Sequence, residues 1–463
     1  MRKPVARRGI LCLVSLDIKN AFNSISWLDF ISTLCKRNVP PYLIRIMKSY
    51  LTDRYLVFPD FKIKLNSGGA QGSILGPLIF LIIFDEIVRM KLDVCAEKNV
   101  YADDTLLTFE TEIVNTFLKD TETTSNKIKK KLKKKKLIVE ESKTEALILA
   151  SSIKDKNIKI KVGDTLVETK NVMKNLGFFL TKNLNFSKHL ELTCSKLKKT
   201  VNHYNQILPN NFGPTFHRRK IIFHSLLSIL FYGVTIWITA IRWKKTITLI
   251  ESSIRPLKKT LICGYKSVSN FAQDTISGVP PENLLIEQKL RIARGENKLN
   301  VEMDIRNKWR EIWTNEKGNK WLKTILKDLD AWLDRKHGYP DFYITQYMSG
   351  HGAIGTYLEK RHLIVSPLCK CGDLDTPDHI FFLCKLNDTS RLELENKINS
   401  KISANNLLAL MLQNRNNWKL GHKYIKDILQ SKAKIYKIAG NNNSNNSAPK
   451  PPDVMPTGGA GLH

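Results

Sequence analysis

Short apolar runs separated by glycine-rich and polar segments predict a mixture of strands and helices in the first part of the chain. The apolar run 11–16 predicts a buried strand that ends at Asp17. Residues 99–101 and 105–109 flank Ala102, Asp103 and Asp104, which predicts a tight hairpin. Residues 146–149 predict a further strand. Helices are expected at 26–35, at 40–51, at 78–84 after a glycine-rich loop, and from about residue 112 to residue 132.

Beyond residue 190 the apolar positions recur at spacings of three and four, which predicts helices. The pattern is clearest over 190–208 and 247–261. Lysines are expected on the exposed sides of these helices: Lys196, Lys198, Lys199, Lys244, Lys245, Lys258 and Lys259.

Two apolar features of this helical part are expected to belong to its core. Four tryptophans, Trp309, Trp313, Trp321 and Trp332, fit core packing better than base stacking. Residues 226–241 are apolar but interrupted by polar groups and too short for an ordinary membrane span, so a buried element is expected and no membrane partner.

Composition narrows the partners. The 463 residues include 74 Lys and Arg against 43 Asp and Glu, a net charge of +31. Such an excess favours a polyanion, with nucleic acid the first candidate and an anionic membrane surface the second. The basic N-terminus and the apolar run after it imitate a secretory signal, but Asp17 interrupts that run and no cleavage site follows, so export is not expected. The scattered cysteines fit a reducing compartment.

The paired carboxylates of Asp103 and Asp104 carry candidate chemistry. Like charges at a hairpin tip repel one another, and a hard cation such as Mg²⁺ would keep both ionised. Asp17 supplies a third carboxylate at the end of a neighbouring strand. Three carboxylates on two strands predict a site for two magnesium ions and nucleotidyl transfer. The alternative for the pair alone is a solvated turn.

The order Asp17, Gln71-Gly72-Ser73 and Tyr101-Ala102-Asp103-Asp104 resembles the palm of reverse transcriptases. Residues 16–24 and the hairpin are similar to LINE-type retrotransposons without long terminal repeats, of the jockey-like and arthropod ribosomal-DNA-inserting groups. The resemblance covers roughly residues 10–385. It implies an RNA-directed DNA polymerase with an RNA template, a DNA primer or target DNA, and deoxynucleoside triphosphates as partners, in a nuclear or intracellular location. The oligomeric state stays open.

The resemblance also implies individual roles. Asp17, Asp103 and Asp104 would hold the catalytic magnesium ions. Phe22 would exclude a ribose 2′-hydroxyl, with a core aromatic as the alternative. Gln71, Gly72 and Ser73 would contact the incoming nucleotide, with a plain glycine-rich turn as the alternative, and Lys143 would lie near its phosphates. Residues 175–180 resemble a primer-grip strand. The lysines at 127–136 could contact phosphate or form a solvated basic face.

Near the C-terminus, Cys369, Cys371, His379 and Cys384 match a Cys₃His structural zinc site in ligand type. The first two cysteines are closer in sequence than is usual, and a chance cluster of reduced thiols is the alternative. Similar knuckle-like sites occur in LINE-type proteins. We therefore expect one structural zinc ion.

The predicted fold class is α+β: an antiparallel palm sheet backed by helices, a helical thumb and a small zinc-knuckle-like module. The expected segments are a palm at 1–182, a thumb or connection at 183–300, a helical linker at 301–365, the knuckle at 366–390, C-terminal helices at 391–437 and a disordered tail at 438–463. Because Asp17 lies near the first residue, we expect an N-terminally truncated chain that lacks most of the fingers and the endonuclease. The alternative function is an inactive nucleic-acid-binding remnant.

Overall fold

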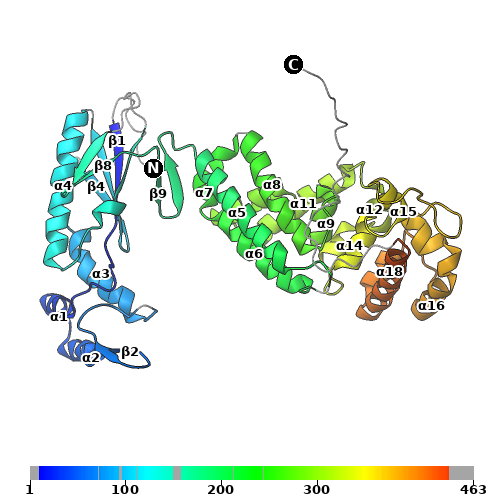
Figure 1. Ribbon diagram of the computed structural model, residues 1–463, viewed down its shortest axis with the longest axis horizontal. Helices are drawn as coiled ribbons and strands as arrows, with labels where there is room; N and C mark the ends of the chain where they lie inside the picture. The colour runs from blue at the N-terminus through cyan, green and yellow to red at the C-terminus, as the bar shows by residue number, and fades with distance from the viewer. Residues whose placement is uncertain are drawn as a thin grey trace, which may run out of the picture. The chain divides into compact units, whose positions relative to one another are not determined.

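The computed structural model describes residues 10–70, 72–92, 96–111, 113–149, 158–211, 213–242 and 244–436. The chain divides into two compact units, Met1–His189 and Leu190–His463 (Figure 1). Gln71 and the predicted disordered tail lie outside the described residues.

The first unit combines a four-stranded sheet with helices and three small hairpins. The sheet contains β1 (Ile10–Leu16), β4 (Ala96–Tyr101), β5 (Asp104–Thr111) and β6 (Glu145–Leu149). The hairpins are β2 (Tyr55–Val57) with β3 (Lys62–Lys64), β7 (Lys159–Val162) with β8 (Thr165–Glu168), and β9 (Val172–Asn175) with β10 (Phe178–Thr181). The helices are α1 (Trp27–Lys36), α2 (Pro41–Leu51), α3 (Leu75–Val88), α4 (Val114–Lys134) and the 3-10 turn η1 (Glu141–Lys143).

The sheet has the order β4-β5-β1-β6, with every pair antiparallel. Alternate side chains of β1 enter two different cores, as the two-residue period of a strand requires. Val14 and Leu16 join the larger core with residues of α3 and α4. Leu13 points to the other face and packs with Met173 of β9. Helices therefore cover one face of the sheet, and β9 contributes to the cover of the other.

Local sequence signals set several element ends. The Ser26 hydroxyl accepts a hydrogen bond from the Asp29 N–H and caps α1, and α2 begins with a proline in its first turn, as predicted. The predicted hairpin at residues 99–109 is confirmed, with Tyr101 paired to Asp104. The single strand expected over 175–180 is wrong. Leu176 and Gly177 both have positive φ, so the chain reverses there and forms the β9–β10 hairpin.

The second unit is helical throughout its described part. Its first helices are α5 (Ser187–Ile207), which begins just before the boundary, α6 (Phe216–Phe231), α7 (Val234–Trp237), the 3-10 turn η2 (Ile238–Arg242), α8 (Lys244–Leu261), α9 (Asn270–Ser277) and α10 (Glu282–Ala293). It continues with α11 (Lys298–Asn315), α12 (Lys320–Ile325), α13 (Leu329–Leu333), α14 (Phe342–Ser349), α15 (Gly355–Glu359), the π-helical turn η3 (His379–Leu383), the 3-10 turn η4 (Lys385–Asn387), α16 (Asp388–Ile398), α17 (Leu407–Gln413) and α18 (Arg415–Ile435).

One hydrophobic core runs from Ile262 to Leu429 and joins residues of α9 to α18. Trp309, Trp313 and Trp332 are buried in it, as predicted, and Trp321 packs at its edge. Trp332 donates a hydrogen bond from Nε1 to the carbonyl oxygen of Thr275 at 2.7 Å. The segment around the clustered cysteines shares this core through Ile380 and Phe381.

The structure corrects the prediction that Lys258 is exposed. α9 and α10 pack against α8 and bury the Lys258 ammonium group between Asp274 and Glu282. Nζ of Lys258 lies 3.2 Å from Oε1 of Glu282. Burial raises the pKa of Asp274 to about 7, while Lys258 opposes the rise. Lys258 is therefore a structural charge. Lys196, Lys199, Lys244 and Lys245 are exposed as expected. Lys198 and Lys259 are only partly exposed, contrary to the prediction, and Lys198 donates a hydrogen bond to the Ser252 hydroxyl at 2.8 Å.

The apolar segment at 226–241 lies in α6, α7 and η2 and buries Leu227, Leu230 and Trp237, as expected for a core element. Within the described chain no single helix meets the length and hydropathy needed to cross a membrane. The bent pair Phe216–Phe231 and Val234–Ile241, with 47° between its parts, meets them only when taken together.

Replacing Trp332 tests the core of the second unit. Trp332→Ala should lower the free energy of unfolding of this unit by about 3–5 kcal/mol, because it removes a fully buried indole and its hydrogen bond. Urea unfolding followed by tryptophan fluorescence measures the change. Leu392→Ala on exposed α16 is the matched control and should change little. Equal stability of the two variants would contradict the packing.

Candidate active site and metal centre

Strand register brings Asp17 and Asp104 together. Leu16 at the end of β1 pairs with Thr105 of β5. Because the two strands are antiparallel, Asp17, which follows Leu16, lies opposite Asp104, which precedes Thr105. Leu16 and Thr105 are buried beneath the helix-covered face. By alternation the two aspartates point to the opposite face, away from α3 and α4.

Asp103 occupies the turn between β4 and β5. Tyr101 and Asp104 form the last pair of the hairpin, so Ala102 and Asp103 alone make the turn. Ala102 has φ 53°, a left-handed conformation that costs a non-glycine residue about 1 kcal/mol or more. Strain of this kind persists where the surrounding structure fixes it and often accompanies function. Here the left-handed residue closes the two-residue turn that carries Asp103.

The carboxylates influence one another. Partial burial raises the pKa of Asp104 above its ordinary value, and the charges of Asp103 and Asp17 raise it further. A cation bound among them would reverse this effect, because it stabilises every ionised oxygen that it touches. The group therefore has the electrostatics expected of a divalent-cation site, and its donor oxygens are those that magnesium prefers.

Lys143 ends η1 beside this site. Its Nζ lies 3.4 Å from Oδ2 of Asp17, and its side chain is largely exposed. The Glu140 N–H donates to the carbonyl oxygen of Asp17 at 2.9 Å, and Ile18 bridges to Val139. These backbone contacts hold the turn that carries Lys143 against the end of β1. The lysine is thus positioned for an anion that binds beside the carboxylates.

Phe22 is half-buried at the edge of the larger core. Its ring centroid lies 5.0 Å from that of Phe80, and its carbonyl oxygen accepts a hydrogen bond from Gly69 at 2.8 Å. The side chain therefore packs on α3, as the core interpretation requires, and its backbone fixes the glycine-rich loop. Its predicted contact with a ribose stays a prediction.

The glycine-rich loop makes close backbone approaches. Gly68 has φ 93°, and a Cβ there would lie 3.0 Å from the carbonyl oxygen of Asn23. Gly72 also has positive φ, and no atom lies within 4 Å of the place a Cβ would take, so the loop is open there. The Ser73 hydroxyl donates to Ala70 and accepts from the Gly76 N–H, which turns the loop into α3. Gln71 lies outside the described residues.

The lysine-rich end of α4 divides into two faces. Lys129 pairs with Glu141 and Asp164, and Lys131 and Lys135 pair with Glu86 of α3. These three side chains hold the helix against its own unit. Another set is exposed to solvent: Lys130, Lys133, Lys134 and Lys136. This second set, together with the exposed Lys127, has the exposure that a phosphate contact needs.

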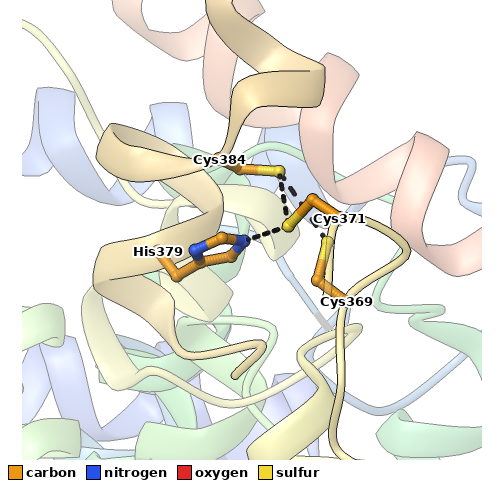
Figure 2. Close-up of side chains that lie close together, drawn as sticks. All are labelled: Cys369, Cys371, His379 and Cys384. Carbon is orange, nitrogen blue, oxygen red and sulfur yellow. Dashed lines mark hydrogen bonds between the residues drawn. The ribbon is translucent and has the colours of Figure 1, made fainter. Parts of the chain in front are cut away.

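In the second unit Cys369, Cys371, His379 and Cys384 come together (Figure 2). Their candidate ligand atoms all lie within 4.8 Å of one another, and among the described residues this is the one group of three or more such side chains gathered closely enough to hold a metal ion. The sulfur of Cys384 lies 3.7 Å from that of Cys369 and 3.8 Å from that of Cys371. Tetrahedral ligands at about 2.3 Å from zinc would be about 3.8 Å apart. The donor set fits zinc.

Two turns build this cluster. Cys369 and Cys371 flank a tight loop in which the Gly372 N–H donates to the carbonyl of Cys369, with Gly372 at φ 97°. His379 opens η3, and the Cys384 N–H donates back to its carbonyl oxygen at 2.8 Å. The wide π-helical turn thereby returns the chain to the same point. Such turns are rare and occur frequently at functional sites.

The cluster is primed for a cation. Burial alone would raise the pKa of the Cys369 thiol, but the backbone N–H of Cys371 and the ammonium of Lys432 are foremost among the groups that lower it to about 6. Burial raises the pKa of Cys384 to about 11, and the neighbouring thiols contribute. A bound metal would deprotonate it. Nε2 of His379 lies 3.1 Å from the Cys371 sulfur, so Nε2 is the ring nitrogen that faces the cluster.

Sequence reasoning missed the residues around this cluster. Asp375 and Lys432 are both buried and form an ion pair of 2.9 Å, and Lys432 also donates to the Cys369 sulfur at 3.1 Å. Asp375 and Lys432 are too far apart in the sequence for any local motif to indicate that they pair. The sequence offers one hint: Lys432 continues the helical spacing of Ile425, Ile428 and Leu429 on the apolar face of α18, a position where a lysine is unusual.

Residues 5–180 match the family described as reverse transcriptase (RNA-dependent DNA polymerase). The chain is 22% identical over 367 residues to a retrovirus-related Pol polyprotein from type-1 retrotransposable element R1 2 of Nasonia vitripennis, covering 70% of this chain and 86% of that protein. It is 21% identical over 409 residues to a putative 115 kDa protein in type-1 retrotransposable element R1DM of Drosophila melanogaster, covering 80% of this chain and 39% of that protein.

Solved telomerase structures are similar over part of the chain. One, from Candida tropicalis in complex with a fragment of telomeric RNA, is 12% identical and covers 64% of this chain and 49% of that chain, with a TM-score of 0.30.

The raised pKa of Asp104 predicts a stability effect in metal-free protein. A carboxyl whose pKa is raised on folding favours the fold while it is protonated, and this contribution is lost as pH rises through the raised value. Asp104→Asn should therefore stabilise the first unit at about pH 7, with the difference vanishing in acid below the ordinary aspartate pKa. Urea unfolding with a chelator present measures both points.

Asp60→Asn, at an exposed aspartate in the same unit, is the control and should leave stability unchanged. A wild type as stable as Asp104→Asn at neutral pH would contradict the electrostatic account of the three aspartates.

Proposed function

We propose that the chain is a LINE-type, R1-like reverse transcriptase, the RNA-directed DNA polymerase of a retrotransposon without long terminal repeats, and that Asp17, Asp103 and Asp104 form its two-metal catalytic site. The observation that carries the proposal is the register of β1 and β5, which sets Asp17 opposite Asp104 beside the Asp103 turn. Two magnesium ions would supply Lewis acidity to a 3′-hydroxyl and to the triphosphate. The carboxylates would hold these ions on the sheet face opposite α3 and α4.

Lys143 and the glycine-rich loop complete the proposed nucleotide site. The ammonium of Lys143, next to Asp17, neutralises phosphate charge. Gly72 and Ser73 lie in the loop that leads into α3, where an open backbone permits a close approach to a nucleotide. Phe22, anchored on Phe80, limits room beside the sugar and selects a deoxynucleotide. Gln71 keeps the role that the family pattern assigns to it.

A basic surface serves the proposed nucleic-acid partners: an RNA template and a DNA primer or target DNA. The exposed lysines of α4 and those of α5 and α8 supply cationic side chains in both units. Their contribution is sequence-independent and sensitive to salt, because it comes from phosphate neutralisation.

We also propose that Cys369, Cys371, His379 and Cys384 hold one structural zinc ion. Support comes from the sulfur separations of 3.7 Å and 3.8 Å and from the burial of three of the four side chains. Zinc bound there would tie the loop that carries Cys369 and Cys371 to the turn η3 that begins at His379. It would supply no chemistry to polymerisation, because three thiolates and an imidazole leave no open coordination position.

A primer-extension assay tests the catalytic proposal. Asp103→Asn should reduce extension on a primed RNA template by at least about a thousandfold, because it removes a charged ligand, while duplex affinity stays within about twofold. Asp60→Asn should retain full activity. Extension by Asp103→Asn at the wild-type rate would refute the site. A wild type that binds the duplex without extending it would favour the inactive remnant.

The sugar contact of Phe22 has a separate test. Phe22→Ala should raise the relative use of ribonucleotides over deoxynucleotides by about tenfold or more, because the ring no longer excludes a 2′-hydroxyl. The kcat/KM ratio for the two substrates, measured on one template, gives the discrimination. Trp27→Ala disturbs the same loop, since Trp27 donates to Gly68 at 2.7 Å, and serves as control for a general loop defect. Equal losses of kcat/KM for ribonucleotides and deoxynucleotides would contradict the role of Phe22 in sugar selection.

A further inference from the structure

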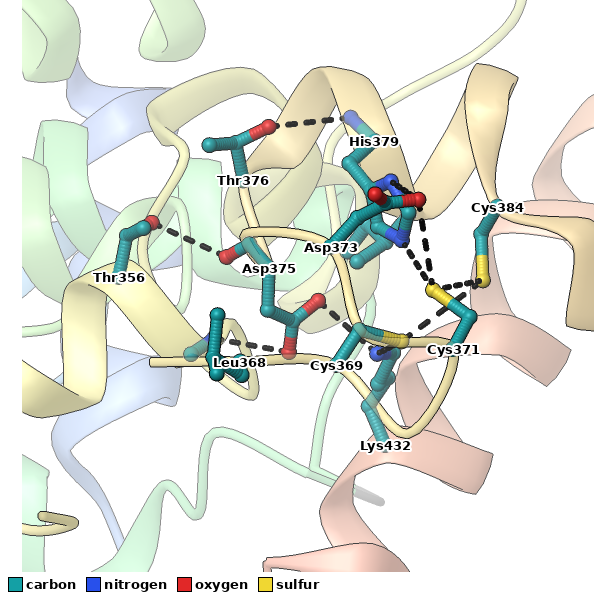
Figure 3. Close-up of polar contacts among 12 residues, drawn as sticks. Thr356, Leu368, Cys369, Cys371, Asp373, Asp375, Thr376, His379, Cys384 and Lys432 are labelled. Carbon is teal, nitrogen blue, oxygen red and sulfur yellow. Dashed lines mark hydrogen bonds and ion pairs between the residues drawn. The ribbon is translucent and has the colours of Figure 1, made fainter. Parts of the chain in front are cut away.

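Asp375 and Lys432 form a buried contact that reaches the clustered cysteines (Figure 3). Asp375 is fully buried and the Lys432 side chain is 6% exposed. Lys432 Nζ lies 2.9 Å from Oδ1 of Asp375 and 3.1 Å from the sulfur of Cys369. One ammonium group, carried by the last helix, thus bridges a carboxylate and a candidate metal ligand.

Asp375 is also fixed by groups outside its own loop, from α15 and from Tyr436 directly after α18. Its Oδ2 accepts hydrogen bonds from the Tyr436 hydroxyl and, at 3.1 Å, from the Gly355 N–H. Its carbonyl oxygen accepts from the Thr356 N–H and hydroxyl, each at 3.1 Å. A Cβ on Gly355 would lie only 2.7 Å from the Cβ of Asp375. Groups other than Lys432 therefore also hold the carboxylate in this position.

A buried ion pair contributes little net stability, because desolvation offsets the attraction. The pair here has a further consequence. Three thiolates, one neutral imidazole and a divalent ion would carry one net negative charge, and Lys432 supplies the matching positive charge at the Cys369 sulfur. Hydrogen bonds from surrounding groups orient metal ligands, and their loss commonly weakens metal affinity by about 10- to 100-fold.

α18 is packed independently of this contact. Ile425, Ile428 and Leu429 lie in the main core of the unit, and the Tyr424 hydroxyl donates to the carbonyl of Phe381. Lys432 lies in the final turns, beyond this packed region. Removing its charge should therefore leave the helix folded and affect mainly its end and the knuckle.

We propose that Lys432 is a positioning residue of the Cys369, Cys371, His379 and Cys384 centre, and that its bridge between Cys369 and Asp375 couples metal binding to the seating of the end of α18. This inference rests on the proposed zinc site. Coupling between two events is reciprocal. Zinc therefore holds the end of α18 in place, and an intact Lys432 bridge strengthens the hold on zinc.

Zinc competition with a chromophoric chelator on the full chain measures one half of the coupling. Lys432→Met should weaken zinc affinity by about tenfold or more. Asp375→Asn, which keeps the size and shape of the side chain but removes its charge, should also weaken zinc affinity. Lys423→Met on an exposed face of α18 is the matched control and should bind zinc as the wild type does.

Hydrogen exchange measures the other half. Zinc should slow exchange over the last turns of α18 in the wild type and in Lys423→Met, and much less in Lys432→Met, while α14 exchanges alike in all three. Wild-type affinity with unchanged zinc protection in both Lys432→Met and Asp375→Asn would overturn the coupling alone. A wild type that holds no zinc would overturn the metal site and the coupling together.

Discussion

The pairing of β1 with β5 holds like charges against their mutual repulsion, and the proposed chemistry depends on it. Each strand is fixed by apolar side chains that enter the larger core beneath α3 and α4, so neither can slip by one residue without exposing that core. The register in turn leaves Asp17 and Asp104 no choice of partner. Core packing thus holds the carboxylates together against their mutual repulsion. A bound cation would relieve that repulsion.

The second unit uses the same principle with a different cation. Thiols from a tight loop and from the end of a π-helical turn converge there. Zinc binding would deprotonate them to thiolates, and Lys432 of α18 would neutralise the one net negative charge that remains. Both centres are therefore places where folding gathers groups whose negative charge a bound cation would offset.

Local patterns in the sequence were sufficient for the strand at 11–16, the hairpin at Tyr101 to Asp104, the first helices and the buried tryptophans. They could not show that the chain reverses at Leu176 and Gly177, because a short apolar run does not distinguish one strand from a tight hairpin. They also misplaced Lys258, since its partners Asp274 and Glu282 come from helices that pack on α8 only in the folded unit. The bridge of Lys432 to Asp375 escaped for the same reason. The spacing of Lys432 after Ile425, Ile428 and Leu429 marks its position as buried, but no local pattern identifies Asp375 as its partner.

Anomalous diffraction from manganese is the most direct test of the central claim, that Asp17, Asp103 and Asp104 share two divalent cations. Crystals of the chain with a primed template, a non-reactive deoxynucleoside triphosphate and manganese would be measured at the manganese edge. The account predicts two peaks about 4 Å apart, both within ligand distance of these carboxylates. A nucleotide bound with no manganese at the three aspartates, or with manganese held by other residues, would contradict it.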